Sequence, residues 1–493
     1  MARSAKVVMA EDRADTGEDA AMSGLVAGAI LGPIVIGLLI LVARRMPVWL
    51  RNLLAMLSTV AVMGCIAVLW LLAGTGSHNL WYFGLLKVQT APVFLVDGVG
   101  LLFAAVFGLV WLLVTIYSLY YMRWYEFQHE YYSFLLIMLG ALVGLCLSQN
   151  LLVIYLFWEI AGIATWRLVA FYRGEKEVKF AQKTVLLTFS GSVLMLVGFA
   201  MVFVEQYTLA ITYLPGGTWS ILSALLILAG MLTKSASMPF YVWLPDAHTA
   251  APSPMSAVLS GVVAKIGLVA YFRIFVQGNM QLPAWWPLLV AGLGLAGSLV
   301  AAGNALWEKD YKRVLALSTV SQLGYVFIGL ALAPGLGLFA AVVYLAAHAL
   351  AKAGLFLAVG EVERATHKRN IDELSGVSNT MPVTAVSVAL LALSIVGLPP
   401  LFGFFGKLYV VVAALQANLI IAVGALAAAV MTVLYMLRLY RIFTGEPKPG
   451  IVGREYPLLT AVVAVFAVVS VAFGVLFPIF GRWVEQSIAG SLL

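Results

Sequence analysis

Long apolar stretches alternate with short polar ones along almost the whole chain. A helix that crosses a bilayer needs roughly 20 predominantly apolar residues. The polar connections between the stretches leave no room for a separate soluble domain. We therefore predict an all-α, polytopic membrane protein with about fourteen transmembrane helices, at 22–43, 52–74, 98–121, 132–149, 151–172, 182–204, 221–243, 254–276, 285–306, 313–332, 337–360, 382–411, 417–440 and 457–479.

The composition agrees with this class and excludes others. Only 10% of residues are charged and 63% are hydrophobic, whereas soluble domains carry about 25% charged residues. Cys65 and Cys146 both lie in apolar stretches and lack metal-ligand spacing, so they predict neither a disulfide framework nor a redox metal centre. We expect no cofactor and no metal in this chain. The net charge of +7 does not indicate a nucleic-acid partner, because the basic residues cluster in short loops.

The basic residues also predict an orientation. Those on one side of the predicted membrane are Arg44, Arg45, Arg51, Arg123, Arg173, Lys176, Lys179, Lys309, Lys312, Arg364, Lys368, Arg369, Arg441, Lys448 and Arg454. The other side holds Lys87, Arg482 and the few basic residues of the N-terminal tail. Positive loops face the cytoplasm, so the chain would be a multi-pass protein of the inner or plasma membrane. An even number of crossings then leaves both termini outside.

Two crossings are interrupted by proline and also carry a lysine. Pro239 follows Lys234, and Pro399 with Pro400 precedes Lys407. Each is the fourth crossing in a block of five, and tandem blocks with an odd number of crossings have inverted topology, as in transporters with ion sites near the midplane. The alternative is that Gly and Pro are simply frequent in transmembrane helices. We predict two broken helices and five parts: a polar tail (1–21), helices one to three (22–130), two inverted five-helix repeats (131–277 and 284–444) and a C-terminal helix (445–493).

Ionisable residues inside apolar stretches are the strongest functional signal, because their burial in a membrane is costly. Lys234 is expected inside an apolar helix (Ile221–Met238), near the break at Pro239. Glu159 has almost entirely apolar neighbours. A buried Glu–Lys pair can change from an ion pair to two neutral groups when a proton arrives, which would form a gate. The alternative is a structural ion pair of Glu159 with Lys234 or Arg167.

Further ionisable residues extend this set into a predicted proton relay. Lys265 lies eleven residues into its apolar stretch, where a lysine cannot easily extend its ammonium to the headgroups. His348 and Lys352 are four residues apart and share a helix face, and histidine titrates near neutral pH. The alternative for His348 is a hydrogen-bonded structural role, and its lysine neighbour argues against a metal site. Lys407 would be the last group of the relay.

The roles of a few charged residues stay open on sequence grounds. Lys183, near the start of its helix, either joins the relay or extends to the headgroups, and Arg167 is a further candidate. Asp97 lies near an outer helix end and is interpreted as structural. Asp246 lies in a Pro-rich stretch that we interpret as a cytoplasmic turn. It either caps the next helix or receives protons at the cytoplasmic opening, and capping is the favoured interpretation.

Several of these stretches resemble the proton-conducting antiporter-like subunit family. Its members include the large pumping subunits of respiratory complex I, large subunits of multi-subunit Na⁺/H⁺ antiporters and matching subunits of membrane-bound hydrogenases. The most specific stretch is KSASMPFYVWLPDAH (234–248). The others are VDG (96–98), WE (158–159), DYKRVLALSTVSQLG (310–324), HALAKAGL (348–355) and LPPLFGFFGK (398–407). The resemblance covers roughly residues 95–445.

The resemblance implies two inverted five-helix repeats, fourteen core helices and a central hydrophilic axis. It implies that Glu159 and Lys234 act as a pair, that Lys265 connects the two halves, and that the second half relays protons to a terminal site. The second-half residues are His348, Lys352 and Lys407. Arg167 stands where the family usually has a small or apolar residue, so the surroundings of Glu159 are expected to differ.

Three functions follow from this sequence interpretation. The leading one is proton translocation by an antiporter-like subunit of a redox-driven complex, either complex I-like or hydrogenase-like. The alternative is a D-like component of a multi-subunit Na⁺/H⁺ antiporter without redox chemistry. The third, a structural membrane component that no longer pumps, is disfavoured because every ionisable position is filled. In each case the partners are other membrane subunits and the lipid bilayer, and protons fit the axis because lysine cannot ligate Na⁺.

Overall fold

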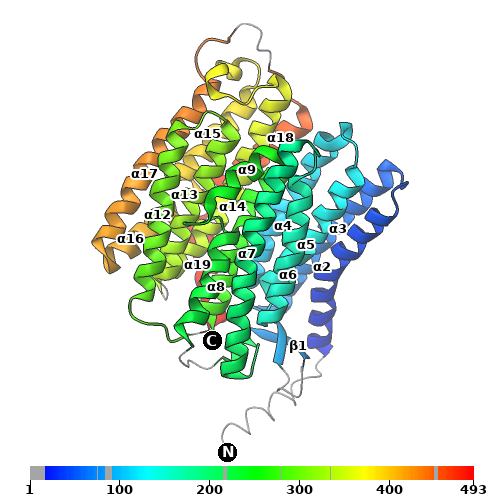
Figure 1. Cartoon of the computed structure of the whole chain (residues 1–493). Helices are drawn as coiled ribbons and strands as arrows, with labels where there is room; N and C mark the ends of the chain where they lie inside the picture. Colours follow the sequence, from blue (N-terminus) through cyan, green and yellow to red (C-terminus); the bar gives the residue numbers. More distant parts are fainter. Residues whose placement is uncertain are drawn as a thin grey trace, which may run out of the picture.

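The computed structural model describes residues 17–74, 76–83, 91–214, 219–278, 280–332, 335–448 and 453–492. Within these ranges the chain forms a bundle of long helices that run roughly side by side (Figure 1). The first sixteen residues of the predicted N-terminal tail lie outside the described residues, and so does Lys87. Residues 17–21, which were also assigned to that tail, are instead the first residues of a helix.

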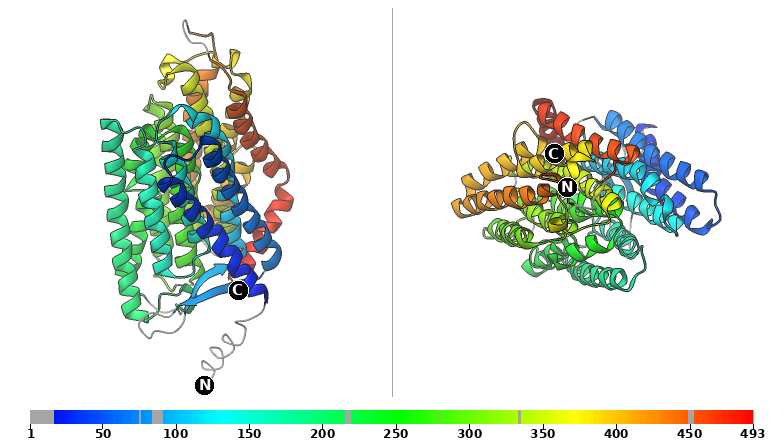
Figure 2. Two further views of the ribbon diagram at one scale, coloured as in Figure 1. Left: turned by 90° about the vertical axis from the view of Figure 1, so that its right-hand side faces the viewer. Right: turned by 90° about the horizontal axis from the view of Figure 1, so that it is seen from above.

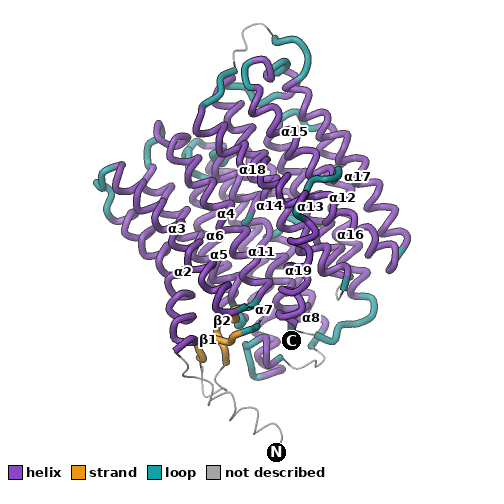
Figure 3. The backbone as a smooth tube through the Cα atoms, turned by 180° about the vertical axis from the view of Figure 1, so that it is seen from behind, coloured by secondary structure: helices purple, strands orange, loops and turns teal. Residues whose placement is uncertain are grey.

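The N-terminal part contains three long helices and a β-hairpin. The helices are α2 (Gly17–Val42), α3 (Val48–Ala73) and α4 (Gly98–Tyr121), followed by the 3₁₀ helix η1 (Met122–Trp124). Between α3 and α4, β1 (His78–Phe83) pairs antiparallel with β2 (Ala91–Val96). Figure 3 shows this hairpin at one end of the bundle. It was not predicted, because strands of six residues are too short to stand out among the long apolar stretches.

The next part of the chain corresponds to the first predicted repeat. Its elements are α5 (Gln128–Leu147), α6 (Leu151–Val169), α7 (Glu175–Gln206), η2 (Ile211–Tyr213), α8 (Ile221–Lys234), η3 (Tyr241–Trp243), α9 (Leu244–Ala250), α10 (Ser253–Gly261), η4 (Val263–Lys265), α11 (Ile266–Tyr271) and the π-helix η5 (Phe272–Gln277). The predicted crossing 254–276 is a single membrane span but not a regular α-helix, because a 3₁₀ turn at Lys265 separates α10 from α11.

The remaining chain corresponds to the second predicted repeat and the C-terminal helix. Its elements are α12 (Trp286–Trp307), α13 (Tyr311–Ala331), α14 (Leu336–Thr366), η6 (Ile371–Glu373), η7 (Val377–Asn379), α15 (Pro382–Val396), α16 (Phe402–Ala417), α17 (Leu419–Tyr440), η8 (Arg441–Phe443), α18 (Pro457–Val475) and α19 (Phe477–Leu492). Seen from above, α2 and α3 lie at one end of the bundle and α16 and α17 at the other (Figure 2). Helix α19 was not predicted, because only its first residues belong to an apolar stretch.

The number of crossings agrees with the prediction. Twelve helices of the described part of the chain are long and apolar enough to cross a membrane. Two further crossings each consist of two shorter helices, α8 with α9 and α15 with α16. With these two, the described part of the chain has fourteen crossings. The all-α, polytopic fold is thus confirmed.

Both predicted helix breaks are present, and the prolines lie inside them. Helix α8 ends at Lys234, so this lysine is the last helical residue and not an interior one as the expected helix Ile221–Met238 implied. Trp243 Nε1 donates to the carbonyl of Thr233 at 2.9 Å, which provides a partner for one carbonyl that the break leaves free. Helix α15 ends at Val396, and Gly397 follows in the left-handed conformation at φ 90°.

The two five-crossing blocks begin at opposite ends of the bundle. Helix α5 starts at the upper end in Figure 1 and α12 at the lower end, and in each block the fourth crossing is the broken one. The start of α2 and the end of α19 both lie at the lower end, as an even number of crossings requires. The loops that carry most of the basic residues lie at the upper end.

Candidate functional site

Glu159 and Lys234 come together at the interface of α6 and α8. Lys234 is buried, and its Nζ lies 5.7 Å from the ring centre of Trp158, next to Glu159. A Cβ placed on Gly162, one turn beyond Glu159, would lie 3.0 Å from the same Nζ. Glu159 is half-buried, and its Oε1 has no hydrogen-bond partner among the described residues. The two side chains are therefore neighbours across the interface of α6 and α8.

Arg167 does not belong to this pair. It forms an ion pair with Glu130, which also bonds Arg173 at 2.7 Å. The proposed structural pair of Glu159 with Arg167 is therefore wrong. Arg167 was expected to change the surroundings of Glu159. Its guanidinium bonds Glu130 instead.

Lys265 is fully buried where helix α10 gives way to a 3₁₀ turn. Its Nζ donates to the carbonyl of Ser260 at 2.5 Å. No carboxylate lies within ion-pair distance of its ammonium in the described part of the chain. The irregular helix thus provides a neutral acceptor for a charge in an apolar setting.

His348 and Lys352 lie on α14 in the centre of the bundle, and both are fully buried. Lys352 donates to the carbonyl of Leu315 at 2.8 Å and to Ser318 Oγ at 2.7 Å. Neither ring nitrogen of His348 has a hydrogen-bond partner among the described residues. The charges of Lys265, Lys352 and Lys407 all act on this imidazole. His348 thus lies within electrostatic reach of one lysine of the first half and two lysines of the second half.

Lys407 lies beyond the second break, on α16. Its Nζ donates to the carbonyls of Ile395 at 2.7 Å and Val396 at 3.3 Å, which are the last residues of α15. The rings of Tyr325 and Tyr344 lie 4.9 and 5.7 Å from it. A helix C-terminus carries partial negative charge, so the break itself creates the site for this cation.

Asp246 does not have the role that the sequence favoured. It lies on α9, a buried helical segment and not a cytoplasmic turn. It does not cap the next helix, α10, whose N-cap residue is Pro252. Its carboxylate bonds Lys183 of α7 and Arg313 of α13, both at 2.7 Å. Asp246 thus ties the second half of the broken helix to its two neighbours, and Lys183 has an ion-pair partner.

His248 is a residue that the sequence analysis missed. It lies on α9, is fully buried, and stacks on Phe356 with ring centres 4.3 Å apart. Both of its ring nitrogens lack a hydrogen-bond partner in the described part of the chain, and the charges of Lys312 and Lys352 act on it. Buried polar atoms normally have partners, so this imidazole is an exception inside the bundle. Its position two residues after Asp246 was the available signal.

Comparisons with known proteins agree with this arrangement. The sequence profile of the family described as "NADH:quinone oxidoreductase/Mrp antiporter, TM" matches residues 148–432. The chain is 35% identical over 393 residues to a Na(+)/H(+) antiporter subunit of type A from Alkalihalophilus pseudofirmus, covering 72% of this chain and 48% of that protein. It is 32% identical over 421 residues to a Na(+)/H(+) antiporter subunit of type A1 from Staphylococcus saprophyticus, covering 78% and 52%. The chain thus spans about half the length of these relatives.

Solved structures share the fold. A chain of the Mrp complex from Dietzia sp. superposes with a TM-score of 0.84 at 24% identity, covering 95% of this chain and 97% of that one. A chain of an archaeal membrane-bound sulfane sulfur reductase gives 0.87 at 22%, covering 95% and 97%. A chain of respiratory complex I from Thermus thermophilus gives 0.82 at 24%, covering 95% and 99%.

Proposed function

Because the chain belongs to the NADH:quinone oxidoreductase/Mrp antiporter family, we propose that it conducts protons as a membrane subunit of a multi-subunit Na⁺/H⁺ antiporter. The names of its curated relatives support this function over a purely structural role and over a redox-driven complex. The solved structures of the sulfane sulfur reductase and complex I share the fold at low identity. Membership of a redox-driven complex, which the sequence analysis placed first, therefore becomes the second candidate.

One observation supports proton conduction above all: buried lysines whose ammonium groups bond helix carbonyls and hydroxyls. Lys265 and Lys407 donate to backbone carbonyls where a helix becomes irregular or ends, and Lys352 donates to the carbonyl of Leu315 inside α13. Such an acceptor is neutral, so the lysine can lose its proton without leaving an unpaired carboxylate behind. A lysine with a desolvated ammonium is suited to load and release protons.

The proposed route runs from Glu159 and Lys234 through Lys265 to the centre of the bundle. There the imidazole of His348, whose nitrogens have no partner among the described residues, receives the proton and passes it on to Lys352 or Lys407. Each step moves one proton between neighbouring groups, and the donor regains its proton from the group before it. Lysine and imidazole exchange protons through nitrogen and offer no oxygen ligands. Any Na⁺ route would thus use other groups or another chain of the complex.

The proposed function also covers the orientation and the partners of the chain. The basic loops at the upper end in Figure 1 would face the cytoplasm, and both termini would lie outside. The partners are other membrane subunits. The chain itself would carry no cofactor and no metal. In the described ranges no three His, Cys, Asp or Glu side chains gather as a metal site would need.

The relay is tested with Lys234→Ala in the complete complex, with proton flux followed by a pH-sensitive dye in inverted membrane vesicles. We expect the coupled flux to fall by about two orders of magnitude, because a proton-transfer group of this kind contributes about 10²–10⁴-fold. The matched control is Lys179→Ala, which removes an exposed lysine from a surface pair with Glu175 and should leave the flux unchanged. Wild-type flux in an assembled Lys234→Ala complex would overturn the relay.

A second measurement separates the two kinds of complex. The native assembly, purified through a tag on this chain, is examined by mass spectrometry and by metal and flavin analysis. Membrane subunits without iron, nickel or flavin support the antiporter. Iron–sulfur or flavin subunits in the same assembly would contradict the antiporter proposal and indicate a redox-driven complex. Nickel would indicate a hydrogenase.

A further inference from the structure

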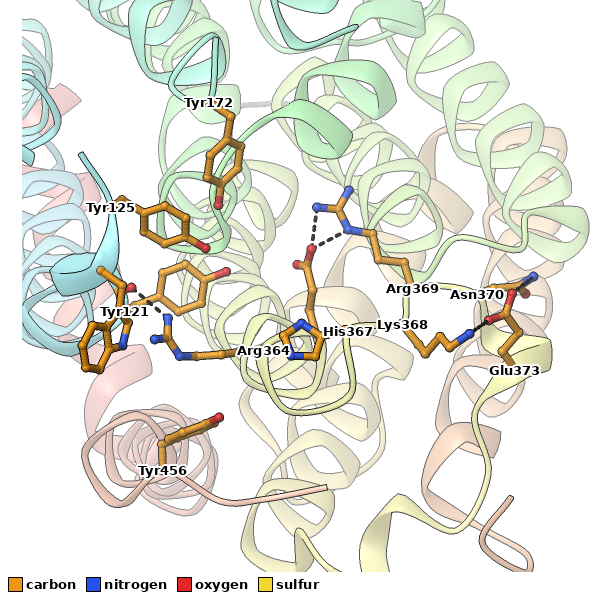
Figure 4. Close-up of a pocket in the computed structure, with 12 residues that line it drawn as sticks. Tyr121, Tyr125, Tyr172, Arg364, His367, Lys368, Arg369, Asn370, Glu373 and Tyr456 are labelled. Carbon is orange, nitrogen blue, oxygen red and sulfur yellow. Dashed lines mark hydrogen bonds and ion pairs between the residues drawn. The ribbon is translucent and has the colours of Figure 1, made fainter. Parts of the chain in front are cut away.

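A large cleft opens at the end of the bundle that carries the basic loops. Its volume is about 980 Å³, and it lies between the upper ends of α4, α6, α14 and α18. Tyr121, Tyr125 and Tyr172 lie toward one side, and Lys368 and Arg369 toward the other (Figure 4). Tyrosine hydroxyls and charged groups of both signs line this cleft. The predicted relay does not include it.

The carboxylate of Glu363 lies at the inner side of this cleft and connects it to the protein interior. It bonds Lys312 at 2.9 Å and Arg369 at 2.5 Å. Glu363 is 19% exposed, whereas Lys312 is 1% exposed, so the pair runs from the cleft inward. The sequence predicts Lys312 among the basic loop residues. The structure places it in the first turn of α13, because Asp310 caps that helix and Lys312 is already helical.

Other groups hold Glu363 in this position. Ser253 Oγ of α10 donates to it at 3.4 Å, and Tyr121 Oη of α4 donates to that same serine. Burial lowers the pKa of Arg369 while the Glu363 carboxylate raises it, and the net direction is upward. Arg369 therefore stays charged and keeps a fixed positive group beside the carboxylate. Of its two cations, Lys312 is the one that can release a proton.

Lys312 and Arg369 also contact the short helix that carries His248. Arg369 donates to the carbonyl of Thr249 at 3.0 Å, and Lys312 Nζ lies 3.4 Å from the carbonyl of Ala251. These carbonyls are one and three residues beyond His248. The charge of Lys312 acts on that imidazole, whose nitrogens have no partner among the described residues. The chain of ionisable groups thus extends from the cleft to His248 and then to Lys352.

We propose that this cleft is the proton inlet on the basic-loop side and that Glu363 and Lys312 transfer protons from it to His248. The proposal rests on the proposed function. Glu363 takes a proton from water in the cleft and becomes neutral, so Lys312 loses its counter-charge. Lys312 gives a proton to the imidazole of His248 and becomes a neutral amine, which the acid form of Glu363 then reprotonates. One proton has moved from water to His248, and the original ion pair is restored.

A second cleft of about 610 Å³ lies on the same end, beside Asp246. Its carboxylate is also close to His248 in sequence, so it is the competing inlet. However, both cations that hold Asp246 are partly exposed, Lys183 at 41% and Arg313 at 32%. Neither leads inward from the cleft as Lys312 does. We assign Asp246 to holding helix α9 in place and Glu363 to proton uptake.

The test measures proton flux in inverted vesicles that contain the complete complex, as a function of pH on the basic-loop side. Glu363→Gln is expected to lower the proton flux about tenfold or more, and the remaining flux should no longer depend on the pH of the basic-loop side. Glu363→Asp should retain most of the flux. Because Glu363→Gln leaves Lys312 buried without a counter-ion, the double variant Glu363→Gln/Lys312→Met is measured too. It should assemble and show the same loss. The control Glu175→Gln removes an exposed carboxylate from a surface pair and should change nothing.

The outcomes separate this proposal from the relay. Wild-type flux and pH dependence in the assembled double variant, while Lys234→Ala abolishes flux, would overturn the inlet and leave the relay intact. Normal flux in Lys234→Ala would overturn the relay itself. A loss of the pH dependence in Asp246→Asn but not in the double variant would place the inlet in the second cleft and refute our assignment.

Discussion

Asp97 and Arg273 form a bidentate ion pair that is completely buried, and its removal gives a sharp prediction about stability. Arg273 Nη1 and Nη2 bond the two carboxylate oxygens at 2.9 and 2.7 Å, and both side chains have zero exposure. Asp97 also accepts from Gly100 N at 3.1 Å and so caps helix α4. Gln277 of the π-helix donates to the same carboxylate and to the carbonyl of Ser491 near the end of α19. The pair therefore joins three distant segments of the chain.

The substitution Asp97→Asn removes the charge but keeps an oxygen for the cap. Breaking a buried pair from one side costs about 3–5 kcal/mol, because the other charge stays buried without a counter-charge. Asp97→Ala removes the cap as well, for a further cost of about 1 kcal/mol. We expect the free energy of unfolding to fall by about 3–5 kcal/mol in the first variant and about 4–6 kcal/mol in the second.

The assay is equilibrium unfolding of the purified protein in mixed micelles with increasing dodecyl sulfate, followed by tryptophan fluorescence. The double variant Asp97→Ala/Arg273→Met should recover more than half of the loss, because both charges are gone. Lys179→Ala, in a solvent-exposed pair, should change stability by less than about 1 kcal/mol. A loss below about 1 kcal/mol in Asp97→Asn, or a double variant less stable than Asp97→Ala, would refute this account.

Two further predictions concern helix packing beside Lys407 and the proton relay. Gly406→Ala should destabilise the protein by about 1–3 kcal/mol, because a Cβ there would lie 2.7 Å from the Cα of Tyr344. The matched control in the same unfolding assay is Gly292→Ala, where a Cβ would meet nothing within 4 Å. Equal stability of the two variants would contradict the packing argument. Lys352→Arg keeps the charge but cannot release a proton, so the proton flux measured in vesicles should fall as far as in Lys352→Met. If the Lys352→Arg variant conducts protons normally, Lys352 only holds Leu315 and Ser318 in place and does not carry protons.

Much of the fold could be predicted from the apolar pattern alone. The number of crossings, the two breaks around Pro239 and Pro399, and the family are confirmed. The crossings rest on the length of the apolar stretches, and the family rests on the motif stretches. The breaks rest on prolines, which lack a backbone N–H and disfavour a helix interior. These are local properties of the chain and need no knowledge of which helices are neighbours.

The errors arose where a residue's role depends on a distant partner. Lys312 has the sequence setting of a loop charge, and its burial follows only from Glu363 on another helix. Arg167 and Glu159 are near each other in sequence, yet Arg167 bonds Glu130. The proton-transfer roles of the relay residues stay predictions, because they depend on proton movement between groups and not on the position of any one of them.

The way the buried lysines are held has a consequence for how charge moves. Their acceptors are carbonyl and hydroxyl oxygens, which cannot be titrated. Positive charges that lack counter-ions repel each other strongly in a medium of low dielectric constant. Adjacent sites would therefore avoid being charged together, and a proton arriving at one would expel the proton at the next. Transport would then proceed by displacement along a file, as ions do in a multi-site channel, and the spacing of the buried lysines would set its step.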